Sequence, residues 1–418
     1  MSLVHVVGAG LAGLSAAVAL VQAGRRVVVH EAAAQAGGRC RSYFDAKLGC
    51  TIDNGNHLLF SANEAALSYL ETIGARDTLI GPDQARFPFV DLASGERWVV
   101  APGAGRLPLW IFDRAKRIPG TRPGAYLAGF RLAGAGPHAT VAQCLDSTDT
   151  LWQRFWRPLT VAALNSDPAE ASARLLWLVL RESFLKGEAA CRPLMARDGL
   201  GASLVDPALK LLSEADAQVC FNHRLRAFDL AEAGVQALDF GGERVDLAPG
   251  DRVVLAVPPP VAAGLLPGLR APDESRPIVN AHIRLPEPPP LPEGLPFVGL
   301  VGGTADWIFL RERIASLTVS AASELAEQPA EVIAKLMWRD TAQALALDPA
   351  LDPPVRVIKE RRATFAQTPA ALACRPPART AWANLLLAGD WTDTGYPATI
   401  ESAVRSGQAA AGIILGQQ

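Results

Sequence analysis

Three glycines near the start of the chain have the types and spacing of a phosphate-binding turn. They follow the apolar run Leu3–Val7, which reads as a short buried strand, in the pattern G-x-G-x-x-G. The first glycine permits a tight turn, the second lets a pyrophosphate approach the backbone, and the third lets the next helix pack against the strand. The free N–H groups at the start of that helix then face the phosphates. The residues predicted to form this contact are Gly8, Gly10, Leu11, Ala12 and Gly13.

A carboxylate stands where a ribose-binding group is expected. The second apolar run, Val27–His30, ends at Glu31, close to the offset of roughly 20 residues that such an acid has from the glycines. Ala32 follows in the same turn. A lone glycine motif is weak evidence, and the alternative is a glycine-rich turn without a ligand. Strand, glycines, helix, second strand and acid in this order nevertheless predict a bound dinucleotide.

Two further motifs lie just beyond buried strands. After Glu31, the sequence Gly37-Gly38-Arg39 places a guanidinium where it can pair with a pyrophosphate; the alternative is an exposed arginine without a ligand. Near the other end of the chain, an apolar run stops at Gly389-Asp390, and a helix is predicted to begin near Thr399. A Gly-Asp pair after a strand is also common in loops without function.

Together these motifs resemble the flavin-containing amine oxidase and carotenoid desaturase superfamily. The resemblance implies that Arg39 belongs to an FAD site, that Asp390 bonds the ribityl chain, and that the helix starting at Thr399 faces the flavin pyrimidine. A helix N-terminus there would stabilise the negative charge of reduced flavin. The resemblance also places residues 53–57 along the flavin ring and residues 219–225 at the adenine. The FAD contacts it implies beyond the first strand–helix unit are Gly38, Arg39, Gly55, Asn56, His57, Leu225, Gly389, Asp390, Thr399 and Ile400. We expect non-covalent FAD, because residues 389–401, where some members attach the flavin through a cysteine, contain neither His nor Cys.

Four stretches are similar to one branch of this superfamily, the hydroxysqualene dehydroxylases of bacterial hopanoid synthesis. They are residues 156–165, 279–285, 302–309 and 388–401, and the similarity extends over nearly the whole chain. Thr399 stands where amine oxidases carry a Tyr of their aromatic cage, which counts against amine oxidation. Ser402 is a departure, since Gly is expected there. The alternatives are a polyene desaturase, an amine oxidase, and a non-catalytic escort protein on the same fold.

The reaction of that branch is the reduction of an allylic alcohol, hydroxysqualene, to squalene. Hydroxide leaves poorly, so an acid should protonate the oxygen as the C–O bond breaks. The allylic cation that develops needs a water-poor pocket. His57 and Asp393 are the candidate acids, because both lie in segments expected near the flavin. Alternatively, His57 bonds a backbone carbonyl and Asp393 caps a turn.

Composition excludes several classes of protein. The 418 residues carry a formal charge of −2, so no global basic field recruits nucleic acid. The six cysteines are far apart in the sequence, which fits reduced thiols in the cytoplasm, and the six scattered histidines predict no metal site. The uncharged start of the chain lacks a basic segment and is rich in glycine, so it reads as strand, turn and helix rather than as a signal or a membrane span.

The predicted fold class is α/β, or α+β overall. We expect a discontinuous Rossmann-type FAD-binding domain with an inserted substrate domain of mixed sheet and helix. The cofactor domain is assigned to residues 1–80, 200–268 and 355–418, and the substrate domain to residues 81–199 and 269–354. The oligomeric state stays open.

One stretch of the expected substrate domain mixes basic and large apolar side chains. Residues 106–131 contain six basic groups against one acid, with aromatic and aliphatic residues between them. Such a mixture can lie on anionic lipid, which predicts peripheral contact with the inner face of the cell membrane. The alternative is a solvated helix and loop with core aromatics. The basic residues are Arg106, Arg114, Lys116, Arg117, Arg122 and Arg131.

Overall fold

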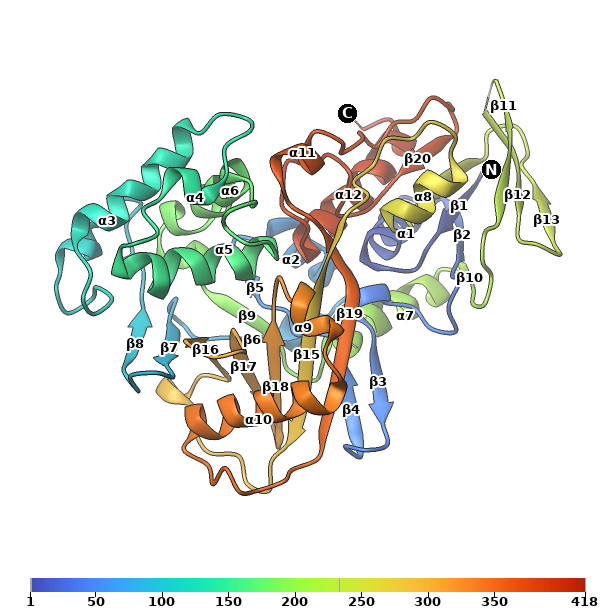
Figure 1. Ribbon diagram of the computed structural model, residues 1–418. Coiled ribbons are helices and arrows are strands. Elements are labelled where there is room, and N and C mark those ends of the chain that lie inside the picture. The colour runs from blue at the N-terminus through green and yellow to red at the C-terminus, as the bar shows by residue number, and fades with distance from the viewer. Residues whose placement is uncertain (1, 233, 418) are drawn as a thin grey trace.

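In the computed structural model, which describes residues 2–232 and 234–417, five parallel strands form the first sheet in the order β10-β2-β1-β14-β20 (Figure 1). These strands are β1 (Leu3–Val7), β2 (Arg26–His30), β10 (Gln218–Cys220), β14 (Arg252–Leu255) and β20 (Leu385–Leu387). Side chains alternate between its two faces. Val4 and Val6 of β1 pack on the helical side, while Val7 belongs to the core on the other side.

Helices cover one face of this sheet and a small antiparallel sheet covers the other. The helices are α1 (Leu11–Gln22), α2 (Glu64–Thr72), α7 (Asp206–Glu214) and α12 (Ile400–Leu415). The small sheet has the order β11 (Ala227–Ala231), β12 (Gly234–Asp239) and β13 (Arg244–Asp246), and α8 (Pro259–Leu265) packs into the same core. These strands and helices come from both ends and the middle of the chain. The discontinuous Rossmann-type unit predicted from the sequence is therefore confirmed.

The second large sheet is mixed and has seven strands, in the order β19-β15-β18-β17-β16-β7-β8. Its strands are β7 (Phe87–Asp91), β8 (Arg97–Val100), β15 (Ser275–Arg284), β16 (Phe297–Val301), β17 (Trp307–Arg311), β18 (Ile314–Val319) and β19 (Val355–Phe365). α9 (Ser323–Glu327) and α10 (Ala330–Leu345) cover one face. We expected residues from 355 onward in the cofactor domain, but β19 pairs with β15 throughout, so the second sheet extends about ten residues further.

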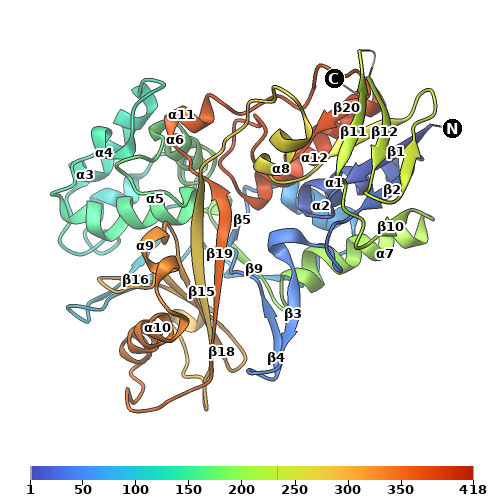
Figure 2. The ribbon, with the colours of Figure 1, turned by 45° about the vertical axis from the view of Figure 1, so that its right-hand side comes forward.

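On the opposite face of the second sheet, polar side chains lie toward the Rossmann-type unit, which we call the first unit. Asn280 and His282 of β15 lie on it, because Val279, Ala281 and Ile283 occupy the α10 side. The hairpin of β3 (Ser42–Asp45) and β4 (Cys50–Asp53) runs beside this sheet in Figure 2. A further small sheet has the order β5 (Leu59–Phe60), β9 (Pro193–Ala196) and β6 (Leu79–Ile80), and α11 (Pro369–Leu372) is a short helix.

A helical lobe lies at the end of the molecule remote from the small sheet (Figure 1). It consists of α3 (Pro123–Leu127), α4 (Val141–Cys144), α5 (Arg157–Leu164) and α6 (Ala173–Glu182). Its core is rich in aromatic side chains and continues into the edge of the second sheet at β7 and β16. None of the described helices is both long and apolar enough to cross a membrane.

Candidate active site

The glycine turn after β1 has the shape of a phosphate cradle. Gly8 has φ +106°, and a Cβ atom there would overlap the carbonyl oxygen of Ala256. A Cβ atom at Gly13 would overlap the carbonyl oxygen of Gly8, whereas one at Gly10 would meet no atom within 4 Å. α1 starts here with no side-chain cap and no acid in its first turn. The open space and the uncapped N–H groups of Leu11 and Ala12 fit the phosphates of FAD.

Glu31 lies at the end of β2 beside this turn. Its Oε2 accepts a hydrogen bond from the N–H of Ala9 at 2.7 Å, and its Oε1 accepts one from the N–H of Ala33 at 2.8 Å. Ala32 between them is exposed. The carboxylate is therefore anchored to the glycine turn, and its remaining lone pairs are free to accept from ribose hydroxyls.

The GGR segment closes on the glycine turn. Gly37 donates its N–H to the carbonyl of Ala9 at 2.8 Å, and a Cβ atom at Gly38 would lie only 3.3 Å from Cα of Gly10. Arg39 then reaches Asp390, with 2.8 Å between Nη2 and Oδ1. Two motifs from opposite ends of the chain are thus joined by an ion pair. The pyrophosphate contact of Arg39 stays a prediction.

The closing segment before α12 is built as the sequence indicates. The helix begins at Ile400, and Thr399 caps it through a 3.3 Å bond from the N–H of Ser402 to its Oγ1. The Ser402 hydroxyl lies 2.6 Å from the hydroxyl of Thr394, so the serine that departs from the expected glycine holds this loop. Gly389 adopts φ +154° and donates its N–H to Ser406.

Sequence reasoning missed a buried arginine that organises this loop. Arg375, 8% exposed, donates to the backbone carbonyls of Asp390, Thr392 and Tyr396. Carbonyls that would otherwise point into the interior are satisfied by one guanidinium. No local pattern marks Arg375 in the sequence, because its partners follow it by 15 to 21 residues in an irregular loop.

His57 lies at a small inner cavity between the first unit and the second sheet. The residues that line the cavity are Asp53, Asn56, His57, Met195, Ala196, Leu200, Phe309 and Arg311. Asp53 forms a 3.0 Å ion pair with Arg311. The Nε atom of Arg311 is buried and has no hydrogen-bond partner in the described part of the chain, so it is available to a ligand. Arg311 was not singled out from the sequence.

The two acids predicted from the sequence differ in position. Burial and the positive charge of Arg39 lower the pKa of His57 to about 4, so its imidazole is neutral at pH 7. Asp393 is exposed, is absent from the lining of the inner cavity, and accepts a 3.3 Å bond from the N–H of Gly395. The turn-capping role that the sequence left open for Asp393 is the one observed.

The carboxyl group of Asp306 has a raised pKa. Burial raises its pKa to about 6, although the N–H of Ser320 and the charge of Arg157 oppose this rise. Its backbone N–H bonds the carbonyl of Thr318, whose hydroxyl accepts a 2.9 Å bond from Asn56 Nδ2, next to His57. This link runs through the backbone N–H of Asp306; its carboxyl group accepts a 2.7 Å bond from the N–H of Ser320 and lies outside the lining of both cavities. Its sequence context marked family resemblance, but nothing local indicated its burial.

A larger apolar pocket opens in the helical lobe. Its lining is aromatic and aliphatic throughout and comprises Pro108, Trp110, Ile111, Tyr126, Gly129, Phe130, Phe155, Trp156, Trp177, Leu180, Phe184 and Leu185. We call this the outer pocket. A row of neighbouring rings leads from it to the inner cavity: Phe184, Phe87, Phe297 and Phe309, with centroids 6.3 to 6.4 Å apart at each step.

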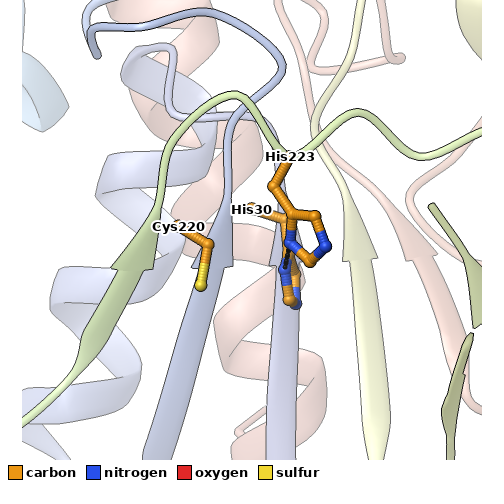
Figure 3. A group of neighbouring side chains, drawn as sticks. All are labelled: His30, Cys220 and His223. Carbon is orange, nitrogen blue, oxygen red and sulfur yellow. Dashed lines mark hydrogen bonds between the residues drawn. The ribbon is translucent and has the colours of Figure 1, made fainter. Parts of the chain in front are cut away.

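The histidines that are scattered in the sequence partly converge in space. His5, His30 and His223 form a hydrogen-bonded row below the small sheet, with distances of 3.1 and 3.0 Å between ring nitrogens. Cys220 lies next to it (Figure 3). Leu225 is buried in the same core. Separation along the chain was thus a poor guide to separation in the fold.

The parallel sheet, the glycine turn and the closing helix define a flavin-dependent oxidoreductase. Residues 11–415 match the model of the flavin containing amine oxidoreductase family. The chain is 50% identical over 413 residues to hydroxysqualene dehydroxylase of Rhodopseudomonas palustris, covering 99% of this chain and 98% of the relative. It is 42% identical over 415 residues to hydroxysqualene dehydroxylase of Zymomonas mobilis, covering 99% of both. The chain therefore belongs to the flavin containing amine oxidoreductases and, within them, to the family of the hydroxysqualene dehydroxylases.

Solved structures show the same fold at low sequence identity. Cyclohexylamine oxidase from Brevibacterium oxydans superimposes with a TM-score of 0.72 at 17% identity, covering 99% of this chain and 98% of the other. A putative protoporphyrinogen oxidase from Exiguobacterium reaches 0.71 at 16% identity, covering 100% and 99%. The predicted fold class is confirmed.

Replacing Glu31 with Ala is expected to weaken FAD binding by tenfold or more. The change removes charge-assisted hydrogen bonds of about 1.5–3 kcal/mol, and about 1.4 kcal/mol corresponds to a factor of ten in the dissociation constant. Fluorescence titration of deflavinated protein with FAD measures the effect, with the exposed Glu71→Ala as the matched control. Equal affinity of the two variants would place the ribose elsewhere.

Proposed function

We propose that this protein reductively removes the allylic hydroxyl of hydroxysqualene to form squalene, with FAD held non-covalently. The observation that carries the proposal is the similarity over nearly the whole chain to proteins named hydroxysqualene dehydroxylase, and the aromatic and aliphatic lining of the outer pocket agrees with it. A long polyprenyl chain needs an extended apolar surface, whereas a small amine or amino acid does not. The names of the full-length relatives agree with this chemistry.

The FAD contacts proposed for this chain follow the cradle described above. The N–H groups of Leu11 and Ala12 would bind the pyrophosphate, Glu31 the ribose, and the start of α12 at Ile400 the flavin pyrimidine. In the reduced state a bound flavin supplies the hydride that replaces the oxygen on carbon. The protein has to supply the proton that turns the leaving hydroxide into water, so that one alcohol yields one hydrocarbon and one water.

Asp306 is the proton donor we propose. A carboxyl with a pKa of about 6 holds its proton in a useful fraction of molecules near neutral pH, and it protonates a leaving oxygen readily. His57 with a pKa of about 4 carries almost no extra proton at pH 7, so we assign it a hydrogen-bonding role at the substrate oxygen or the flavin. The apolar lining limits water, which would otherwise trap an allylic cation.

Anaerobic incubation with hydroxysqualene tests the function directly. Chemically reduced protein should return squalene and oxidised flavin in equal amounts, measured by mass analysis and by absorbance. Oxidation of a polyene by the oxidised protein would instead identify a desaturase, and turnover of amines an amine oxidase. A purified protein that never binds FAD would support the escort alternative.

Non-covalent attachment has a simple test of its own. Acid precipitation should release the yellow chromophore into the supernatant, because no His or Cys lies within residues 389–401. Colour that stays with the pellet would contradict this attachment.

We further propose that the rim of the outer pocket rests on the cytoplasmic face of the membrane. Leu107, Leu109 and Phe112 are 69%, 66% and 61% exposed, which is unusual for side chains of this size. Arg106, Arg114, Lys116, Arg122 and Arg131 are exposed in the same stretch, so apolar groups and positive charge occur together. Ile111 and Tyr126 are buried and belong to the lobe core. A surface of this kind fits anionic lipid, from which a polyprenyl substrate can enter.

Changing Leu107, Leu109 and Phe112 together to Ser should reduce cosedimentation with anionic vesicles at least tenfold. Each side chain loses apolar burial in the lipid, at about 25 cal/mol per Å². FAD content should stay unchanged, because the stretch lies outside the cofactor segments. The matched control replaces three other exposed apolar residues, Val261, Val332 and Leu351, by Ser. Equal loss in both triple variants, or no loss in either, would exclude this surface as the membrane contact.

A further inference from the structure

Two ends of neighbouring strands and one tight turn bring three metal-ligating side chains together below the small sheet. His30 is the last residue of β2, and Cys220, its register partner, is the last residue of β10. Partners in adjacent strands project their side chains from the same face. His223 follows Cys220 in the spacing C-x-x-H, across a turn in which Asn222 has φ 55°.

Backbone hydrogen bonds of Glu31, just after the end of β2, fix the positions of Cys220 and His223. Glu31 donates its N–H to the carbonyl of Cys220 at 2.8 Å, and its own carbonyl accepts from the N–H of His223 at 2.8 Å. The His223 ring also stacks on Phe240, with 3.7 Å between centroids. The three side chains are therefore placed by strand pairing and packing rather than by a mobile loop.

The ligand atoms face one another. Nδ1 of His30 and Nδ1 of His223 are 3.0 Å apart, and one ligand atom from each of the three residues lies within 4.8 Å of the others (Figure 3). Within residues 2–232 and 234–417 this is the one group of three such residues that converges so closely. Tetrahedral Zn²⁺ has Zn–N distances of about 2.0 Å and Zn–S distances of about 2.3 Å. The two Nδ1 atoms are already close to the separation of two ligands of one such ion, and Sγ of Cys220 lies within 4.8 Å of a ring nitrogen of each histidine.

One of the two remaining ring nitrogens already has the partner that a metal-bound imidazole requires. Nε2 of His30 lies 3.1 Å from Nδ1 of His5, whereas Nε2 of His223 lies 3.4 Å from Oε2 of Glu243 and forms no hydrogen bond within the described residues. A histidine that binds metal through one nitrogen usually donates the other N–H to a carboxylate, a carbonyl or a similar acceptor. The tautomer of His30 that donates from Nε2 to His5 leaves its Nδ1 unprotonated and available to an ion.

We propose that His30, Cys220 and His223 bind one Zn²⁺ ion through two Nδ1 atoms and Sγ, with a fourth position left for water. Two imidazoles and a thiolate select zinc or copper(I) over magnesium and calcium. The thiolate and the nearby Glu243 carboxylate balance the charge of the ion. Bound zinc would join the ends of β2 and β10 on both sides of Glu31.

Zinc content and affinity test the site in the FAD-loaded, full-length protein. After chelator treatment and dialysis, wild-type protein should take up one Zn²⁺ per chain, measured by elemental analysis and by competition with a chromophoric chelator. Cys220→Ser and His223→Gln should each bind at least tenfold more weakly. The matched controls, Cys374→Ser and His138→Gln, remove the same side chains elsewhere and should bind as wild type does.

Cobalt gives an independent readout of the ligand set. One equivalent of Co²⁺ should produce d–d bands at wavelengths beyond the flavin absorption, and these should be lost in Cys220→Ser. Wild-type protein that takes up no zinc would overturn the proposal and leave a metal-free row of hydrogen-bonded histidines. Equal zinc affinity in wild type and Cys220→Ser would overturn the assigned ligands. Both variants change side chains at the surface end of the group, and an unchanged circular dichroism spectrum and thermal midpoint will verify that they fold.

Discussion

Replacing Asp306 with Asn is expected to lower kcat for the reduction of hydroxysqualene by two to four orders of magnitude, while FAD content and substrate binding should stay near wild type. General acid catalysis contributes about 10²–10⁴ in rate, and Asn keeps the size of the side chain but has no transferable proton of comparable acidity. Single-turnover oxidation of reduced flavin by the alcohol measures the step directly.

The raised pKa of Asp306 also predicts the direction in which the rate changes with pH. The pKa of Asp306 is raised to about 6, so the protonated, active form dominates below that pH and is lost as pH rises above it. The wild-type rate should therefore rise from pH 8 toward pH 6 and level off below, and Asp306→Asn should lose this dependence. Asp393→Asn is the matched control, since that exposed carboxyl caps a turn. A normal rate in Asp306→Asn with a large loss in His57→Gln would move the proton donor to His57.

Filling the outer pocket should select against long substrates. Leu185 is half-buried in the pocket wall, and Leu185→Trp adds an indole where we expect the far part of the polyprenyl chain. Excluding a few methylene groups, each worth about 0.8 kcal/mol, should raise KM for the thirty-carbon alcohol at least tenfold. A fifteen-carbon allylic alcohol, which is too short to occupy both cavities, should keep its KM.

The substrate comparison separates two kinds of failure. Loss of activity toward both alcohols in Leu185→Trp, with normal activity in Leu351→Trp at an exposed position outside the pocket, would indicate general damage to the lobe. Unchanged KM for both alcohols would show that the chain lies elsewhere. A wild-type protein inactive toward either alcohol would reject the proposed function itself.

The FAD-type cradle is largely a local property of the sequence. The steric need for glycine at Gly13, whose Cβ would overlap the Gly8 carbonyl, and the cap at Thr399 depend on residues within about one turn of each other. Short-range sterics and hydrogen bonding decide such elements, so their spacing can be recognised without a structure. The strands β1, β2 and β20 and the helices α1 and α12 were predicted for this reason, whereas β10 was not predicted as a strand.

Features that depend on contacts between distant segments needed the tertiary structure. Arg39 and Asp390 form one ion pair although they are 351 residues apart. The strand β19, which looked like part of the cofactor domain, is decided by its pairing with β15. The sequence around one partner of such a pair does not indicate which distant residue or strand is the other partner.

The pKa values of side chains, and the grouping of side chains that are distant in the sequence, also depend on the folded structure. Nothing next to Asp306 in the sequence indicates a shifted pKa; burial in the fold raises its pKa, against the opposing effects of the Ser320 N–H and the Arg157 charge. The histidines were read as scattered because sequence distance was the only measure, whereas parallel pairing of β2 with β10 brings His30 beside Cys220 and His223. Sequence spacing therefore determined where a dinucleotide is predicted to bind, and desolvation and strand pairing decided which side chains meet and which protons they hold.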